Sequence, residues 1–163
     1  YGLSFVSKSD RDIMTMILFA VNGVEDKKVL DLGVGTGRTT EILLPKSKEY
    51  IGTDYSPKGI EICKSRFPDG EFIVNDFTEG LPFDDNSYDF VFYVAGVDIH
   101  CEDRLGKLKI TDEGINKRDQ IVIENFYSRN TPLCGVLGGG YNKSFEKLIE
   151  LHSMLHKNCA KII

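Results

Sequence analysis

Short apolar runs and amphipathic stretches alternate along the chain, and glycine, proline or polar turn residues separate them. The apolar runs predict five strands, at residues 28–32, 50–54, 71–76, 88–97 and 133–137. Apolar residues three or four positions apart predict five helices, at residues 10–21, 39–44, 57–66, 112–128 and 145–155. Strands that alternate with helices are typical of a parallel sheet with crossover helices.

The predicted helices carry recognisable starts and inward faces. Ser9, Ser56 and Thr111 suit the N-cap position, and Pro57 suits the first position of its helix. The apolar spacing predicts three buried faces: Ile13, Met16, Ile17 and Ala20; Ile115, Val122, Ile123 and Phe126; and Phe145, Leu148, Ile149, His152 and Leu155. The run at 88–97 is apolar at nearly every position, as in a strand covered on both faces. We therefore predict a single α/β domain over residues 1–163, a Rossmann-like three-layer sandwich with a five-stranded parallel sheet in the order 3-2-1-4-5.

Composition restricts the classes of partner. The chain has 163 residues, 41% hydrophobic and 28% charged, which is ordinary globular usage. Its net charge of −5 argues against a nucleic-acid surface, and no apolar run approaches the roughly 18 residues of a membrane span. The four cysteines form no CxxC pair, so we expect reduced thiols, no metal and a cytoplasmic location.

The strongest motif is a glycine loop between the first strand and the next helix. It reads Asp-Leu-Gly-Val-Gly-Thr-Gly-Arg over residues 31–38. Glycines allow tight turns and close approach to a ligand, and a helix start offers unpaired N–H groups. A dinucleotide fingerprint would place its third small residue at position 38, which is Arg38, and no Gly-Lys-Ser/Thr phosphate loop follows. Taken alone, such a loop is often only a tight turn.

This loop closely resembles motif I of the class I S-adenosylmethionine (SAM) methyltransferases. The resemblance implies that Asp31 lies near the ammonium group of SAM and that the loop around Val34 meets its carboxylate. Gly33, Gly35 and Gly37 match the family's loop glycines. The expected ligand is SAM or its product S-adenosylhomocysteine.

Further motifs follow in the family's order, and the resemblance covers residues 10–92. Asp54 ends the second strand, where an acid accepts both ribose hydroxyls, and Tyr55 would pack near the adenine. Asp76 and Phe77 match the segment whose acid meets the adenine amino group. Residues 81–89 match the lead-in to the fourth strand. Asp54 alone could be a helix-preceding cap and Asp76 a solvated turn acid, but the joint pattern favours a SAM pocket.

Residues 93–163 resemble a different family, the C-terminal end of histone-deacetylase-like zinc amidohydrolases of class IV and bacterial type. The segments that carry this resemblance are Ala-Gly-Val-Asp at 95–98, Glu-Asp-Arg-Leu-Gly-Lys-Leu at 102–108 and Leu-Gly-Gly-Gly-Tyr at 137–141. It implies that Asp98 matches one metal ligand and Tyr141 the tyrosine that polarises the substrate carbonyl. No histidine precedes His100, so the family's other ligands and its tandem histidines are missing and both residues are expected to be vestigial.

Two weaker metal options remain open. Asp98 and His100 form an Asp-x-His pair on one face of an extended segment, with Cys101 close by. His152 and His156 stand four positions apart on the last helix. Ordinary loop and helix-face residues explain both pairs.

The chain thus reads as a chimera whose halves, 1–92 and 93–163, join within the strand at 88–97. Natural recombination and deliberate fragment exchange are both open, and we favour an engineered protein. The predicted function is SAM binding with weak or no methyl transfer, because the segments that would contact an acceptor are replaced. The alternatives are a non-catalytic structural hybrid and an inactive remnant of a zinc-dependent deacetylase. A fifth strand at the sheet edge would favour a homodimer.

Overall fold

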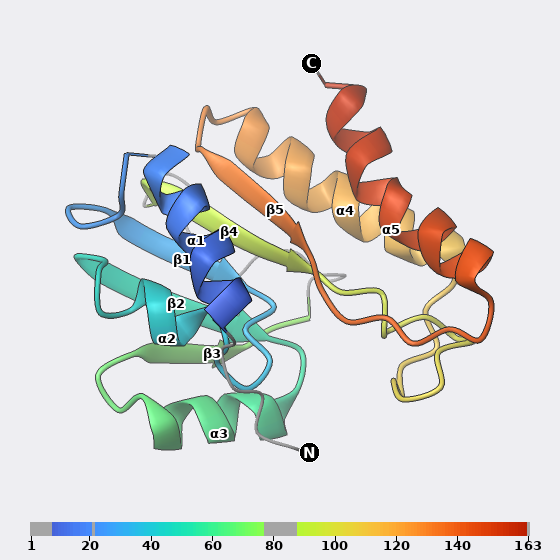
Figure 1. Cartoon of the computed structure of the whole chain (residues 1–163), viewed down its shortest axis with the longest axis horizontal. Helices are drawn as coiled ribbons and strands as arrows, with labels where there is room; N and C mark the ends of the chain where they lie inside the picture. The colour runs from blue at the N-terminus through green and yellow to red at the C-terminus, as the bar shows by residue number, and fades with distance from the viewer. Residues whose placement is uncertain (1–7, 21, 77–87, 163) are drawn as a thin grey trace. The chain divides into compact units, whose positions relative to one another are not determined.

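The computed structural model describes residues 8–20, 22–76 and 88–162. Its strands are β1 (Lys28–Leu32), β2 (Glu49–Asp54), β3 (Glu71–Val74), β4 (Phe90–Ala95) and β5 (Leu133–Leu137). Its helices are α1 (Lys8–Ala20), α2 (Thr40–Leu43), α3 (Pro57–Arg66), α4 (Asp112–Tyr127) and α5 (Phe145–Ala160). The strands form a parallel sheet in the order β3-β2-β1-β4-β5 with flanking helices, as predicted (Figure 1).

The chain divides into two compact units, Tyr1–Phe92 and Tyr93–Ile163. The boundary falls inside β4, at the residue where the two sequence resemblances meet. No helix in the described ranges is long and apolar enough to cross a membrane.

In the first unit, strand register brings the candidate site together. β1 and β2 pair in parallel with Leu32 opposite Thr53, and β2 pairs with β3 so that Asp54 lies opposite Val74. The carboxyl ends of these three strands therefore share one edge, where the loops that follow them must also lie. α3 packs against β2 and β3. The interior of this unit is apolar: Val29, Leu30, Leu32, Leu43, Ile60 and Phe72 are all buried.

Local sequence explains the start of α3, and this prediction is confirmed. The Ser56 hydroxyl accepts the Gly59 N–H at 3.1 Å, and Pro57 takes the first helical position, where its missing N–H costs nothing. α2 is shorter than predicted. It holds only the turn Thr40–Leu43, and the chain continues in turns through Pro45.

The predicted start of α1 is wrong, and of its predicted inward face Met16 is exposed while Ile17 is half-buried. α1 begins at Lys8, so Ser9 lies inside the helix and not at its N-cap. Met14 and Leu18, four positions apart, are buried at 6% and 8% exposure, whereas Met16 is 72% exposed. The cause is that apolar residues lie all around this helix, so spacing alone does not fix which face packs inward. The side chains of Ile13 and Ala20 lie outside the described residues.

The second unit confirms one helix face and corrects another. Thr111 caps α4 by accepting the Gly114 N–H at 3.2 Å. The predicted inward face of α4 is buried at all four positions: Ile115, Val122, Ile123 and Phe126. On α5, Leu151 and Leu155 are buried, while Phe145 and Ile149 are exposed at 71% and 54%. Two apolar stripes overlap on α5, and its packing against α4 selects the one that contains Leu151.

Candidate functional site

The glycine loop after β1 takes a backbone path that side chains disfavour. Gly33, Gly35 and Gly37 have φ angles of +84°, +56° and +92°. A Cβ at Gly37 would lie 2.4 Å from Cε2 of Phe67, whereas a Cβ at Gly35 would meet nothing within 4 Å. Glycine is therefore required at 37 by packing as well as by φ, and at 35 by φ alone.

Several amides of this loop already have partners within the protein. Gly33 and Val34 donate to the Thr53 carbonyl at 2.8 and 3.1 Å, and Gly37 donates to the Val34 carbonyl at 2.8 Å. Gly35 donates to Oδ2 of Asp54 at 2.7 Å. These bonds clamp the loop to the end of β2. A ligand that takes these amides exchanges existing hydrogen bonds and does not fill unpaired donors.

Asp54 links the two strand ends. Its Oδ1 accepts the Ser56 N–H at 2.9 Å while Oδ2 accepts the Gly35 N–H. Burial raises the pKa of Asp54, and these two amide bonds offset the rise only in part. Next to it, Tyr55 is 48% exposed, which leaves its ring available to stack on a ligand.

Asp31 is fully buried at the centre of a hydroxyl network. Its Oδ2 accepts from Thr39 Oγ1 at 2.6 Å and from the Tyr50 hydroxyl at 2.7 Å. The Tyr50 hydroxyl also lies 2.7 Å from Thr40 Oγ1. Burial, the main cause, raises the pKa of Asp31 to about 7 against the lowering effect of the two hydroxyl bonds. Oδ1 of Asp31 is buried and has no hydrogen-bond partner among the described residues.

Three residues of this site escaped the sequence reasoning: Tyr50, Thr39 and Arg66. Tyr50 reads as a core ring in the sequence, and it is buried, but its hydroxyl bonds to Asp31. The available signal was that a buried tyrosine hydroxyl needs a partner. Arg66, at the end of α3, donates to the Thr36 carbonyl of the glycine loop and pairs with Glu41 at 3.6 Å.

Only part of the predicted adenine-binding segment lies within the described residues. Asp76 follows β3 and is half-buried. Phe77 and most of the lead-in to β4, residues 81–87, lie outside the described residues.

The residues present fit a SAM-like ligand on two observations of this structure. The orphaned Asp31 oxygen lacks a donor, and a cationic amine would supply one. The Gly35 position leaves space for a ligand to approach the backbone. Asp31, the glycine loop, Asp54 and Tyr55 would hold the ligand, which when bound supplies an electrophilic methyl group.

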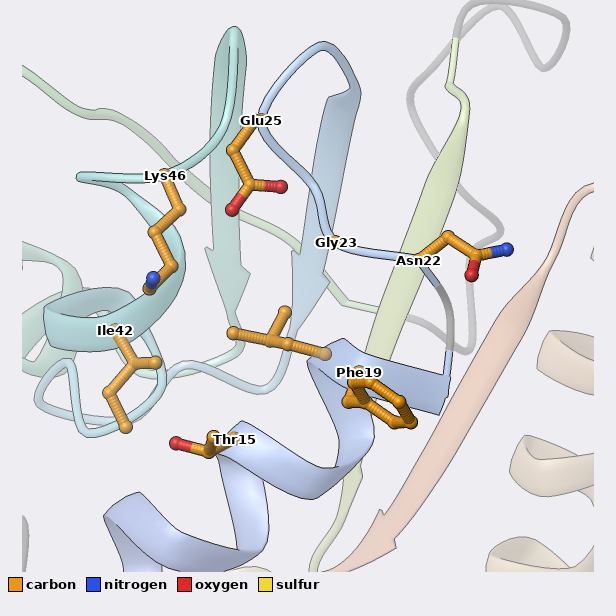
Figure 2. Close-up of a pocket in the computed structure, with 8 residues that line it drawn as sticks. Thr15, Phe19, Asn22, Gly23, Glu25, Ile42 and Lys46 are labelled. Atoms are coloured by element: carbon orange, nitrogen blue, oxygen red, sulfur yellow. The ribbon is translucent and has the colours of Figure 1, made fainter.

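Two hollows of the first unit are lined neither by the glycine loop nor by Asp31 and Asp54. One, of about 490 Å³, opens between α1, the turn after it and the α2 segment. Figure 2 shows Thr15 of α1 on the side of Ile42 from α2, Phe19 farther along α1, and Glu25 on the turn. The other is lined by residues of the 44–51 and 66–71 segments and Lys28. Tyr50 and Arg66 line the second hollow, and no other described site residue lines either one.

In the second unit, Asp98 and Tyr141 lie in a loop region that is held by backbone contacts. The carboxylate of Asp98 packs against Gly139, where a Cβ would come within 2.5 Å of Oδ2. Tyr141 is 44% exposed, and its N–H donates to Asp103 Oδ2 at 2.6 Å. Oδ1 of Asp103 accepts two more amides, from Leu105 and Gly106.

The weaker metal options gain no support from the structure. Nε2 of His100 lies 2.8 Å from Oδ1 of Asp112, and Nδ1 lies 3.3 Å from the Glu102 N–H, so both ring nitrogens face a partner other than Asp98. His156 is exposed and His152 is half-buried. Over residues 8–20, 22–76 and 88–162, no three metal-ligating side chains gather into a site.

A buried charge cluster joins β4 to α4. Oδ1 of Asp119 accepts from the Tyr93 hydroxyl at 2.6 Å and from Nε and Nη2 of Arg118 at 3.0 and 2.8 Å. Nη1 of Arg118 donates to the Gly96 carbonyl at 2.6 Å. Burial, the main cause, raises the pKa of Tyr93. Each nitrogen of the Arg118 guanidinium donates one hydrogen bond within the protein, which is the arrangement expected of a structural ion pair.

Two families of known proteins match overlapping parts of the chain. Residues 29–108 match a family described as a methyltransferase domain, and residues 83–155 match one described as a histone deacetylase domain. A demethylmenaquinone methyltransferase from Thermotoga maritima is 36% identical over 110 residues, which cover 66% of this chain and 47% of that protein. Histone deacetylase 2 of Arabidopsis thaliana is 43% identical over 61 residues, 37% of this chain and 16% of that protein.

Other similarities concern the chain as a whole. A Picosynechococcus protein whose name assigns no activity is 30% identical over 96% of this chain and 56% of its own length. The chain therefore spans about half the length of these curated relatives. The structure of a SAM-dependent methyltransferase from Clostridium acetobutylicum has a TM-score of 0.51 at 21% identity, covers 77% of this chain and 46% of that one, and shows the same fold.

Strand order, the glycine loop and these matches define the class of protein. The fold is that of a Rossmann-like α/β domain. Its first part, over residues 29–108, is similar to a family described as a methyltransferase domain.

Proposed function

We propose that this protein binds SAM or S-adenosylhomocysteine at the carboxyl ends of β1 and β2, with weak or no methyl transfer of its own. The observation that carries the proposal is the glycine loop, which has three positive φ angles and is tied to the acid at the end of β2. That combination supports a ligand with both a charged amino-acid end and a ribose.

Each site residue has a role in this proposal. Asp31 faces the ligand's ammonium group, and the loop formed by Gly33, Val34, Gly35 and Gly37 surrounds its carboxylate. Asp54 accepts the ribose hydroxyls, which requires it to give up the Gly35 or Ser56 amide. Tyr55 stacks on the adenine, and Asp76 with Phe77 borders the adenine amino group.

We expect weak methyl transfer because the segment that would contact a methyl acceptor has a different origin. Methyl transfer depends mainly on holding a nucleophile in line with the methyl group. The segment after β4, where we expect acceptor contacts, is similar to histone deacetylases. We therefore propose a chain that joins two lineages. The match of one family to residues 29–108 and of the other to residues 83–155 supports this, as does the unit boundary between Phe92 and Tyr93.

Calorimetric titration with SAM and S-adenosylhomocysteine tests the binding function, with Asp54→Ala beside the parent chain. We expect binding by the parent and a loss of at least tenfold in Asp54→Ala, since two ribose hydroxyls lose a charged acceptor, at about 1.5–3 kcal/mol per bond. Equal affinity in both proteins would contradict the assigned site. Methyl transfer to small-molecule and protein pools is then assayed with the loaded protein, and sustained turnover would refute the second part of the proposal.

We also propose that the chain pairs with a second copy along β5. This strand is last in the sheet order, and Leu133–Leu137 contains no charge and no proline to discourage strand pairing. Light scattering coupled to size exclusion should show a dimer that Val136→Lys weakens. A monomer at high concentration would refute the pairing.

A further inference from the structure

The two carboxylate oxygens of Asp31 differ in their hydrogen bonding. Oδ2 receives two hydroxyl donors, from Thr39 and Tyr50. Oδ1 receives none from the part of the chain that the structure describes, although it is also buried away from water. A buried carboxylate oxygen without a donor is costly, so a protein that keeps one leaves a place for a donor that it does not itself supply.

The network of hydroxyl groups determines which oxygen of Asp31 is left without a hydrogen-bond donor. The single hydrogen of the Tyr50 hydroxyl is directed to Asp31, so Thr40 must be the donor in the contact between Thr40 and Tyr50. Tyr50 therefore has both of its hydroxyl functions engaged and cannot turn away from Asp31. With Thr39 on the same oxygen, the carboxylate cannot rotate without losing two hydrogen bonds.

We propose that Tyr50 is a positioning residue of the ligand site, which holds Asp31 so that Oδ1 receives the ligand's cationic amine, and that binding of this amine displaces a proton from Asp31. The inference rests on the proposed function and deepens it. The proton passes to the solvent, and the carboxylate then pairs with the ammonium group.

Burial favours the protonated form of Asp31 when no ligand is bound, and the hydroxyl bonds from Thr39 and Tyr50 oppose it only in part. Asp54 on β2 is a second acid near it and raises the pKa of Asp31 further. Cys63 on α3 also faces it, and burial raises the pKa of that thiol to about 11. Burial likewise raises the pKa of Tyr50. With a pKa of about 7, Asp31 is about half protonated at neutral pH.

The direction of the pH dependence follows from this. Below pH 7 a growing share of Asp31 is neutral, and a bound ammonium group must first displace the proton. Affinity for an amine-bearing ligand therefore falls as pH falls, by roughly tenfold per pH unit well below the pKa of the free protein.

The test uses two ligands that differ in the amino-acid part. S-adenosylhomocysteine carries the amine, and 5′-methylthioadenosine lacks it. Each is titrated calorimetrically into the whole chain from pH 5.5 to 7.5, in two buffers of different ionisation enthalpy. We expect S-adenosylhomocysteine to release about half a proton at pH 7 and to weaken toward pH 5.5, and 5′-methylthioadenosine to show neither effect.

Three variants separate positioning from structure. Tyr50→Phe removes a donor to the carboxylate, which should move the pH midpoint of binding upward by about one unit or more. Thr40→Val is the matched control, because it removes the other contact of Tyr50 and leaves both bonds to Asp31, so the midpoint should stay in place. Asp31→Asn should abolish the proton release. Thermal melts check that each variant is folded.

The outcomes distinguish this inference from the function on which it rests. If neither ligand binds the folded parent chain, the proposed function is wrong and this inference falls with it. If both ligands bind but S-adenosylhomocysteine binding is independent of pH and releases no proton, the function stands and the coupling is refuted. Equal midpoint shifts in Tyr50→Phe and Thr40→Val would refute the positioning role of Tyr50.

Discussion

Two alanine substitutions in the glycine loop give the sharpest test of its geometry, because the two glycines share a positive φ but differ in its value and in their packing. Gly35 and Gly37 both have positive φ, but only Gly37 is packed against a side chain. Gly35→Ala therefore measures the backbone conformation alone. Gly37→Ala measures the conformation together with the contact to Phe67.

The magnitudes follow from the coordinates. The φ of +56° at Gly35 lies in the left-handed region, where an alanine costs about 1–2 kcal/mol. The φ of +92° at Gly37 lies outside that region, with a cost of about 1–3 kcal/mol, and the overlap with Phe67 adds about 1–3 kcal/mol. The Phe67 ring cannot move freely. Its centroid lies 6.5 Å from that of Phe72, and the Arg66 guanidinium lies over its face.

The assay is urea unfolding, in which the variants should share the parent's dependence of unfolding free energy on urea concentration. Thermal melting is the check. We expect Gly35→Ala to lose about 1–2 kcal/mol and Gly37→Ala about 2–6 kcal/mol, and each kcal/mol lowers the Tm of a domain of this size by about 2–4 °C. Ligand affinity should show the reverse order in folded protein, because a methyl group at Gly35 enters the space where the ligand approaches. Equal destabilisation by both variants would refute the loop packing.

Three further changes test the rest of the fold. Asp119→Ala leaves the buried Arg118 charge without its carboxylate and should cost about 3–5 kcal/mol in urea unfolding, against a much smaller loss for an exposed control, Glu113→Ala. Thr111→Ala removes the cap of α4 and should cost about 1 kcal/mol, whereas Thr111→Ser should restore most of it. Burial works against ionisation of Asp103, but its three amide donors outweigh it and lower its pKa, so its contribution to stability should be present above about pH 4 and be lost as pH falls through the lowered value. Asp103→Asn should flatten that part of the stability profile, and an unchanged profile would show that Asp103 does not contribute.

The sequence was sufficient for the strand order and for most element bounds. Some features depend only on residues that are close in the sequence. The Ser56 cap, the proline after it and the apolar run of β4 are of this kind. The inward face of α4 was also readable, because its apolar residues form a single stripe. The glycine loop was readable for the same reason, since a positive φ imposes glycine at each such position.

Tertiary structure decided what the local pattern left ambiguous. α1 and α5 carry apolar residues on more than one face, so only their packing partners determine that Met14 and Leu151 are buried while Met16 and Ile149 are exposed. The periodicity of apolar residues shows which side of a helix is buried only when polar residues occupy the opposite side.

The chemistry of the site needed the fold for a different reason. Asp31 was recognisable from its motif, but its partner Tyr50 comes from the neighbouring strand, 19 positions away. The sequence by itself determined which residues have unusual backbone or charge. Only the register of β1 against β2 and the closing of the loop onto Asp54 decided which of them touch, because hydrogen bonds between strands depend on distances in space that sequence separation does not encode.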